Sequence, residues 1–191
     1  MKQAEGKRGP VAAALAVGFV AAAAAGLLTA SQVRSTSSVE FCASCHEMTL
    51  FRRTWETGPH GTARMGAIKA RCVDCHLPHE GVVGYLAVKT RAGIHDVLAH
   101  LTGKKTDWLS KWKNRGPHVH GAYESGCRHC HKDLVVPGIP IKAFSAHRAY
   151  RLGETTLHCL DCHQKAGHGD IAAVLQAGGG QGDGPAGGGR L

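Results

Sequence analysis

Aromatic side chains are scarce in this chain, whose 191 residues include only four Phe, three Trp and three Tyr. So few large apolar rings argue against a large core of the ordinary kind. The sequence also lacks a long alternation of polar and apolar residues, and with 26 Gly this argues against a β-sandwich or β-barrel. The length fits one domain with tails. Something other than side chains must supply the apolar bulk of that domain.

Cysteine follows a strict pattern. The eight Cys form four Cys-x-x-Cys pairs, and a His follows each pair directly. No Cys is left for a disulfide or a reactive thiol. The motifs read CASCH at 42–46, CVDCH at 72–76, CRHCH at 127–131 and CLDCH at 159–163, so the paired cysteines are Cys42 and Cys45, Cys72 and Cys75, Cys127 and Cys130, and Cys159 and Cys162.

Cys-x-x-Cys-His is the attachment signature of c-type haem, in which two thiols form thioethers to the porphyrin and the His reaches the iron. Zinc sites and thioredoxin-like redox motifs also use Cys-x-x-Cys pairs. At the His frequency of this chain, 14 in 191, chance would place His after all four pairs only about once in 30,000 sequences. The pattern therefore predicts four covalently bound haem c groups.

Four haems would supply the missing bulk, because each is a large flat apolar body around which short helices and loops pack. We therefore expect a mainly α fold with little β, in which one N-terminal transmembrane helix precedes a small multihaem c domain whose core is the four haems. The formal charge of +9 then mostly balances the haem propionates. We expect no nucleic-acid partner.

An uncharged stretch of 20 residues, VAAALAVGFVAAAAAGLLTA, runs from Val11 to Ala30. About 20 apolar residues cross the hydrocarbon core of a bilayer as a helix. A cleaved secretory signal is the alternative, but its apolar region usually has about 7–15 residues. We predict an uncleaved single-pass anchor in the bacterial cytoplasmic (inner) membrane. Because haem thioethers form outside that membrane, the haem domain is expected in the periplasm.

The charge-free stretch and the four haem motifs divide the chain into segments. Within the haem domain, helical period is seen at Ile94, Val97, Leu98 and Leu101, which predict one amphipathic helix. The predicted segments are a cytoplasmic N-terminus at 1–10, the transmembrane anchor at 11–30, a connector at 31–38, the periplasmic tetrahaem domain at 39–173 and a disordered Gly-rich tail at 174–191.

Four haems have up to eight axial positions, and the motif histidines His46, His76, His131 and His163 account for four of them. More histidines remain than there are positions, and for any one of them an exposed or propionate-bonding role is the alternative. The remaining candidates are His60, His79, His95, His100, His118, His120, His129, His147, His158 and His168.

The N-terminal anchor, the order of the four motifs, the run HGTARMGAIKARCVDCHLPHE and the segment CLDCHQKAGH together resemble one family. The sequence is similar to the membrane-anchored tetrahaem cytochromes c of the NapC/NirT family, from Val11 to Ala173. The resemblance implies a protein that takes electrons from membrane quinol and passes them to a periplasmic reductase.

Within this family the chain most resembles the small, quinol dehydrogenase subunit of cytochrome c nitrite reductase. The first shared pattern is CASCHEM, in which Met48 follows the motif His46 by two residues. The resemblance implies that Met48 ligates the first haem and leaves its other face open. In the alternative, Met48 packs on the haem and His46 binds the iron.

The second pattern is Lys89 with Asp96 seven residues later, which puts both on nearly one face of a helix, although Gly93 weakens its continuity. The resemblance implies that Asp96 lies over the open face of haem 1 and that Lys89 lines a quinol pocket beside it. A solvated helix face with an incidental charge pair is the alternative.

The resemblance also implies the other ligand pairs. His158 is the substitute for His147, and His79 has no assigned role. The implied pairs are His60 with His131 on haem 3, His168 with His76 on haem 2, and His147 with His163 on haem 4.

The expected function is menaquinol oxidation, with electrons passed to the catalytic subunit of a periplasmic multihaem reductase, most simply a pentahaem nitrite reductase. The expected partners thus include the membrane quinone pool and the lipid bilayer. Alternatives are a quinol-oxidising donor to a nitrate or trimethylamine-oxide reductase, a passive multihaem electron carrier, and a catalyst that uses an open haem 1.

Overall fold

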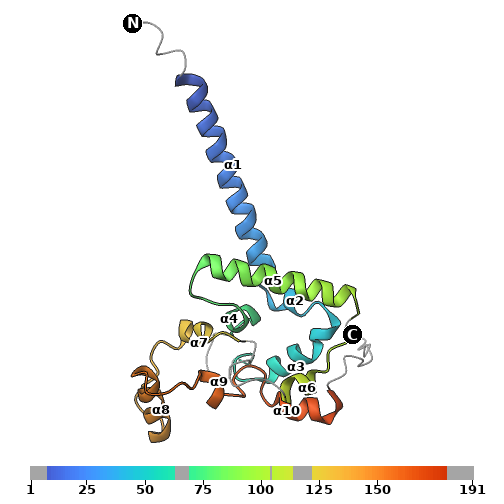
Figure 1. Cartoon of the computed structure of the whole chain (residues 1–191), viewed down its shortest axis with the longest axis vertical. Coiled ribbons are helices and arrows are strands. Elements are labelled where there is room, and N and C mark those ends of the chain that lie inside the picture. The colour runs from blue at the N-terminus through green and yellow to red at the C-terminus, as the bar shows by residue number, and fades with distance from the viewer. Residues whose placement is uncertain (1–7, 63–68, 104, 114–121, 180–191) are drawn as a thin grey trace.

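The computed structural model describes residues 8–62, 69–103, 105–113 and 122–179, and within these ranges it contains helices and no strands. One long helix leaves a compact group of short ones (Figure 1). This confirms the predicted mainly α fold. The helices are α1 (Arg8–Ser35), α2 (Val39–Cys42), η1 (His46–Met48), α3 (Thr49–Thr57), α4 (Cys72–His76), α5 (Val82–Leu101), α6 (Trp108–Lys113), α7 (Glu124–Cys130), α8 (Ile141–Arg151), α9 (Cys159–Cys162), α10 (Ile171–Val174) and η3 (Leu175–Gly179).

Helix α1 is long and apolar enough to cross a membrane over Gly9–Ser35, and none of it is buried against the rest of the protein. Its many Ala and Leu residues favour a helix. It contains the predicted anchor at 11–30 and continues through part of the predicted connector to Ser35. The predicted N-terminus lies mostly outside the described residues.

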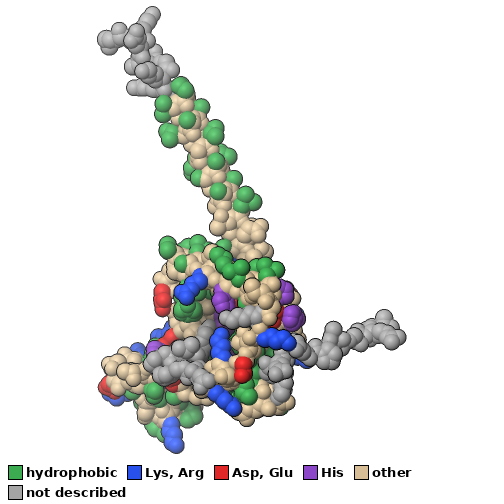
Figure 2. Space-filling model, turned by 45° about the vertical axis from the view of Figure 1, so that its right-hand side comes forward, with side chains coloured by type: hydrophobic (Ala, Val, Ile, Leu, Met, Phe, Trp, Pro, Cys, Tyr) green, Lys and Arg blue, Asp and Glu red, His purple; other side chains and the backbone are tan. Residues whose placement is uncertain are grey.

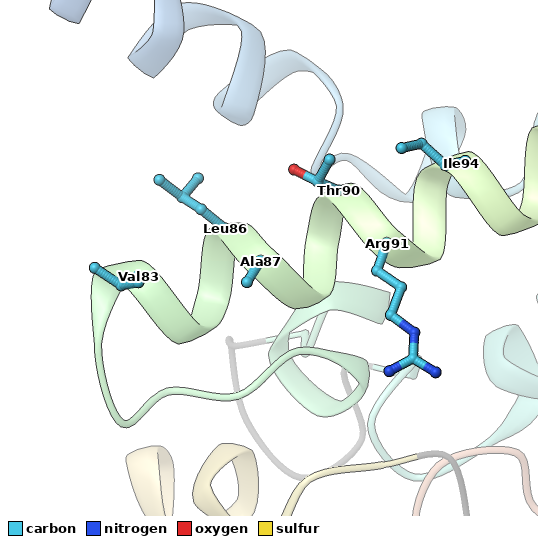
Figure 3. Close-up of a pocket in the computed structure, with 6 residues that line it drawn as sticks. All are labelled: Val83, Leu86, Ala87, Thr90, Arg91 and Ile94. Carbon is cyan, nitrogen blue, oxygen red and sulfur yellow. The ribbon is translucent and has the colours of Figure 1, made fainter.

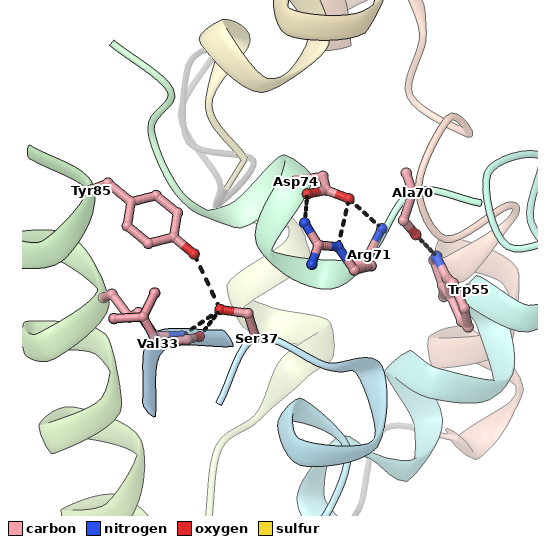
Figure 4. A network of polar contacts seen from close by, with 8 residues as sticks. Val33, Ser37, Trp55, Ala70, Arg71, Asp74 and Tyr85 are labelled. Atoms are coloured by element: carbon pink, nitrogen blue, oxygen red, sulfur yellow. Dashed lines mark hydrogen bonds and ion pairs between the residues drawn. The ribbon is translucent and has the colours of Figure 1, made fainter. Parts of the chain in front are cut away.

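Helix α5 lies across the end of the domain from which α1 leaves (Figure 1). It contains the predicted amphipathic segment 94–101 but begins earlier, at Val82, and runs without a break through Gly93. Hydrogen bonds attach it to the end of α1: Ser37 Oγ is bonded to Tyr85 Oη at 3.2 Å and donates to the carbonyl oxygen of Val33 (Figure 4). The membrane helix and α5 therefore form one connected unit.

Buried side chains lie on both sides of the predicted domain boundary at residue 173. Leu175, in the predicted tail, is 3% exposed, and Ile171 on α10 is also buried. Helical structure continues to Gly179. Residues 180–191 of the predicted tail lie outside the described residues.

Candidate functional site

The cysteines of each motif are three residues apart, so on a helical turn both thiols face the same side. Helices α4 and α9 supply that turn at the second and fourth motifs. The Asp before the second Cys caps each turn: Asp74 accepts the backbone N–H of Arg71 at 2.8 Å, and Asp161 accepts that of His158 at 2.6 Å. Burial alone would raise the pKa of Asp74, but hydrogen bonds from Arg71 lower it (Figure 4).

The four motifs follow one another in space in chain order. Cys42 of motif 1 lies next to Cys72 of motif 2, and Cys127 of motif 3 lies next to Cys159 of motif 4. Between them, α4 and α7 pack closely, and the backbone N–H of Tyr123 donates to the carbonyl oxygen of Cys75 at 2.7 Å. The structure thus forms a continuous row from motif 1 to motif 4.

Each of the last three motif histidines lies next to a histidine from elsewhere in the chain. A metal bonded to two imidazoles at about 2 Å each would hold the two bound nitrogens about 4 Å apart. The distance between the ring centroids is longer, because each centroid lies about 1 Å behind its nitrogen. The ring centroids are 6.0 Å apart for His60 and His131, 6.2 Å for His76 and His168, and 6.0 Å for His147 and His163. These are the three pairs that the resemblance implied.

In each pair the non-motif ring is held at Nδ1, which directs Nε2 toward the partner, as in metal-binding histidines. Burial and the neighbouring His76 lower the pKa of His168, which favours the neutral form that binds a metal. The bonds are from His60 Nδ1 to the carbonyl oxygen of Ala166 (2.7 Å), from His147 Nδ1 to that of Leu134 (2.7 Å), and from His168 Nδ1 to that of Phe51 (3.0 Å).

The sparse side-chain core also fits haem. In the described part of the domain the buried hydrophobic side chains are Val73, Leu77, Ile171 and Leu175. Four buried side chains cannot stabilise a domain of this size. Four haem macrocycles would provide the missing apolar centre. The donor set and the packing both fit four haem c groups.

Motif 1 differs from the other three. The ring of His46 lies 5.7 Å from that of His100, and His100 Nδ1 is 2.9 Å from Glu47 Oε1. Met48 ends the short helix η1 on the same loop. His100, to which the motifs assign no role, lies four residues after Asp96 and therefore on the same face of α5. Both Met48 and the His46–His100 pair are therefore present at this motif.

Lys89 and Asp96 both lie within electrostatic range of Cys42 in motif 1. Lys89 Nζ donates to the carbonyl oxygen of Thr36 at 2.8 Å and to Ser37 Oγ at 3.0 Å. Partial burial lowers the pKa of Lys89. The side chain of Asp96 is 76% exposed, and its Oδ1 lies 3.0 Å from His95 Nδ1.

Two other candidate histidines have different surroundings. His158, the substitute for His147, has its Nδ1 paired with Glu124, which raises its pKa. His79 stacks near His129 with centroids 4.7 Å apart. His118 and His120 lie outside the described residues.

Comparison with known proteins agrees with this arrangement. Residues 5–173 match the model of the NapC/NirT cytochrome c family, N-terminal region. The chain belongs to the NapC/NirT cytochrome c family. Its relatives include the tetraheme c-type cytochrome CymA of Shewanella oneidensis, which is 30% identical over 83% of this chain and 90% of that protein. The NapC protein of Haemophilus influenzae is 27% identical over 71% of this chain and 70% of its own length.

A solved structure with a similar fold is that of the cytochrome c nitrite reductase NrfHA complex bound to the HQNO inhibitor. One of its chains superimposes with a TM-score of 0.55 at 24% identity, over 81% of this chain and 90% of that one. Membership of the NapC/NirT family and the tetraheme relatives support covalently bound haem c in this chain. They also support single-pass membrane anchoring through α1.

Proposed function

We propose that this NapC/NirT cytochrome oxidises menaquinol at the periplasmic surface of the cytoplasmic membrane and passes the electrons to a periplasmic pentahaem nitrite reductase. The observation that carries the proposal is the placement of Lys89 and Asp96. Both lie on α5 next to the first haem motif, and Lys89 is bonded to the end of the membrane helix. This is where a lipid-soluble donor meets the domain.

Oxidation of a quinol releases two protons with its two electrons, so the site needs groups that bind and accept protons. The exposed carboxylate of Asp96 is suited to accept a proton from a quinol hydroxyl and release it to water. Lys89, whose pKa burial lowers, is suited to hydrogen-bond the other oxygen. When bound, the haems supply one-electron transfer away from this site.

We further propose the axial ligands as His76 with His168, His131 with His60, and His163 with His147. Each pair would supply two ligands to a haem iron. Such a haem transfers electrons but has no free position for a substrate. At motif 1 we propose Met48 as the residue that would hold the iron.

The quinol proposal is tested on the full-length holoprotein in detergent. A menaquinol analogue is expected to reduce the haems. Their absorption measures the fraction that is reduced. Dithionite serves as the control for total reducible haem. Full reduction by dithionite with no reaction toward the quinol would identify a passive carrier and contradict the proposal.

The choice of partner is supported by the fold shared with a chain of the nitrite reductase complex and by the Met48 and Lys89/Asp96 patterns. The similarity to NapC points instead to a different reductase. Proteoliposomes that contain this protein and quinol, supplied in turn with nitrite, nitrate or trimethylamine-oxide reductase, separate the alternatives. We expect the fastest turnover with nitrite reductase. Faster turnover with either other enzyme would refute this partner.

Replacement of Met48 by His is expected to lower the reduction potential of one haem, because a thioether ligand raises the potential relative to imidazole. The other three haems should keep their potentials. A redox titration followed by absorption measures all four. Unchanged potentials in M48H would mean that His46, and not Met48, binds the iron of the first haem. Mass spectrometry of the haem content verifies that all four haems are attached.

A further inference from the structure

Helix α5 has two distinct faces, centred about 110° apart around its axis. Residues at 85, 89, 96 and 100 share one face by their spacing; Tyr85 and Lys89 contact the end of α1, and His100 contacts the first haem motif. The other face repeats at 83, 86, 90, 94, 97 and 101. We name it the apolar stripe; its members are Val83, Leu86, Thr90, Ile94, Val97 and Leu101.

Five of the six residues of the apolar stripe are exposed, and Leu86 is half-buried. Val83 is 82% exposed and Leu101 is 74% exposed, with Ile94 and Val97 more than half exposed between them. The stripe contains no charged residue, and its single polar member is Thr90. The stripe forms one row along a helix of 20 residues, whereas exposed apolar side chains on a soluble surface are usually scattered singly.

The direction of the stripe indicates what covers it. Figure 3 shows Leu86, Thr90 and Ile94 on the side of α5 from which α1 leaves, whereas Arg91 points the opposite way. In Figure 2, hydrophobic side chains line α1 and gather again on the end of the domain from which α1 leaves. The bonds from Lys89 and Tyr85 to the end of α1 hold α5 at the level where the chain leaves the bilayer.

We propose that α5 is an interfacial helix whose apolar stripe is buried in the lipid leaflet next to the domain. Such helices lie parallel to the membrane with the apolar face about 5–10 Å into the boundary between headgroups and acyl chains. The occupant is lipid, because the stripe lies on the side of α5 from which the membrane helix leaves. This proposal does not depend on quinol oxidation.

The arrangement has a consequence for the face of α5 that carries Lys89 and Asp96. A helix with its side chains is about 10–12 Å wide, so these two residues, at the flank of the apolar stripe, would lie within one helix width of the acyl chains. The site would thus be in reach of a donor dissolved in the membrane while its polar groups stay in the headgroup layer.

Photo-crosslinking of the full-length holoprotein in phosphatidylethanolamine and phosphatidylglycerol vesicles tests the proposal. A benzophenone amino acid replaces Ile94 in one variant and Ile141 in the matched control. Ile141 is also an exposed Ile, at 75%, and it lies on α8 away from α1 (Figure 1). After irradiation, mass spectrometry should find lipid adducts several-fold more often at position 94 than at 141.

A second variant guards against misfolding at Ile94. Thr90, the polar member of the stripe, is replaced in the same way, and haem content verifies that each variant is mature. We expect lipid adducts there too. Equal yields at 94, 90 and 141 would overturn the proposal, as would adducts at 94 and 90 that are exclusively with protein, which would mean that a polypeptide covers the stripe.

Discussion

Replacement of Asp96 by Asn is expected to slow menaquinol-driven haem reduction by about 10²–10⁴-fold, the usual contribution of a positioned proton acceptor. The amide keeps the size of the side chain but no longer accepts a proton. Because Asp96 is exposed and contributes little to packing, the stability and haem content should not change. Stopped-flow absorption with a menaquinol analogue measures the rate, and dithionite reduction should remain complete.

Two variants make this result specific. Glu154→Gln makes the same chemical change at an exposed acid beyond α8 and should leave the rate unchanged. Tyr85→Phe removes the hydrogen bond to Ser37 from the same face of α5 without removing a charge. If Tyr85→Phe slowed the reaction as much as Asp96→Asn, the effect would belong to the junction with α1. An unaltered rate in Asp96→Asn would remove Asp96 from the quinol site.

Replacement of Gly126 by Ala is expected to disrupt the contact between the second and third haem motifs. A Cβ at this position would lie 2.1 Å from the carbonyl oxygen of Asp74 and 3.2 Å from its carbonyl carbon. Both atoms belong to the backbone, so α4 and α7 would have to separate. Overpacking typically costs about 1–3 kcal/mol, and a clash this close should reach the upper part of that range. Thermal unfolding followed by circular dichroism, together with the yield of tetrahaem protein, measures the effect.

Gly93→Ala is the matched control. A Cβ at Gly93 meets nothing within 4 Å, and the residue lies inside helix α5, where Ala is favoured over Gly by up to about 1 kcal/mol. The thermal midpoint should therefore stay the same or rise. If Gly126→Ala matured and unfolded like Gly93→Ala, the close approach of α4 and α7 would not be required for the holoprotein.

Local signals in the sequence were sufficient for several features. The Cys-x-x-Cys-His repeats indicate haem attachment because the chemistry needs only five consecutive residues. The charge-free stretch at 11–30 predicts the long apolar helix because hydrophobicity and length decide a membrane span. The spacing of Ile94, Val97 and Leu101 predicts part of α5 for the same kind of reason, since helical period is local.

Other features depend on residues far apart in the chain. His60 lies next to His131, and His168 next to His76, so each pair joins segments that no local pattern connects. The resemblance to a family implied these pairs, whereas the residues alone left ten candidates. Only the tertiary structure brought His100 to His46 and showed Gly126 against Asp74, because both contacts arise where separate helices cross.

The sequence by itself determined the chemistry of this protein: the haem-binding motifs, the membrane helix and the kinds of side chain available for proton transfer. The tertiary structure decided which histidines face each other, the order of the motifs in space, and the position of Lys89 at the end of α1. It also buried Leu175, which the sequence alone does not indicate. The physical reason is that motif chemistry depends on neighbouring residues, whereas packing depends on which surfaces meet after the chain has folded.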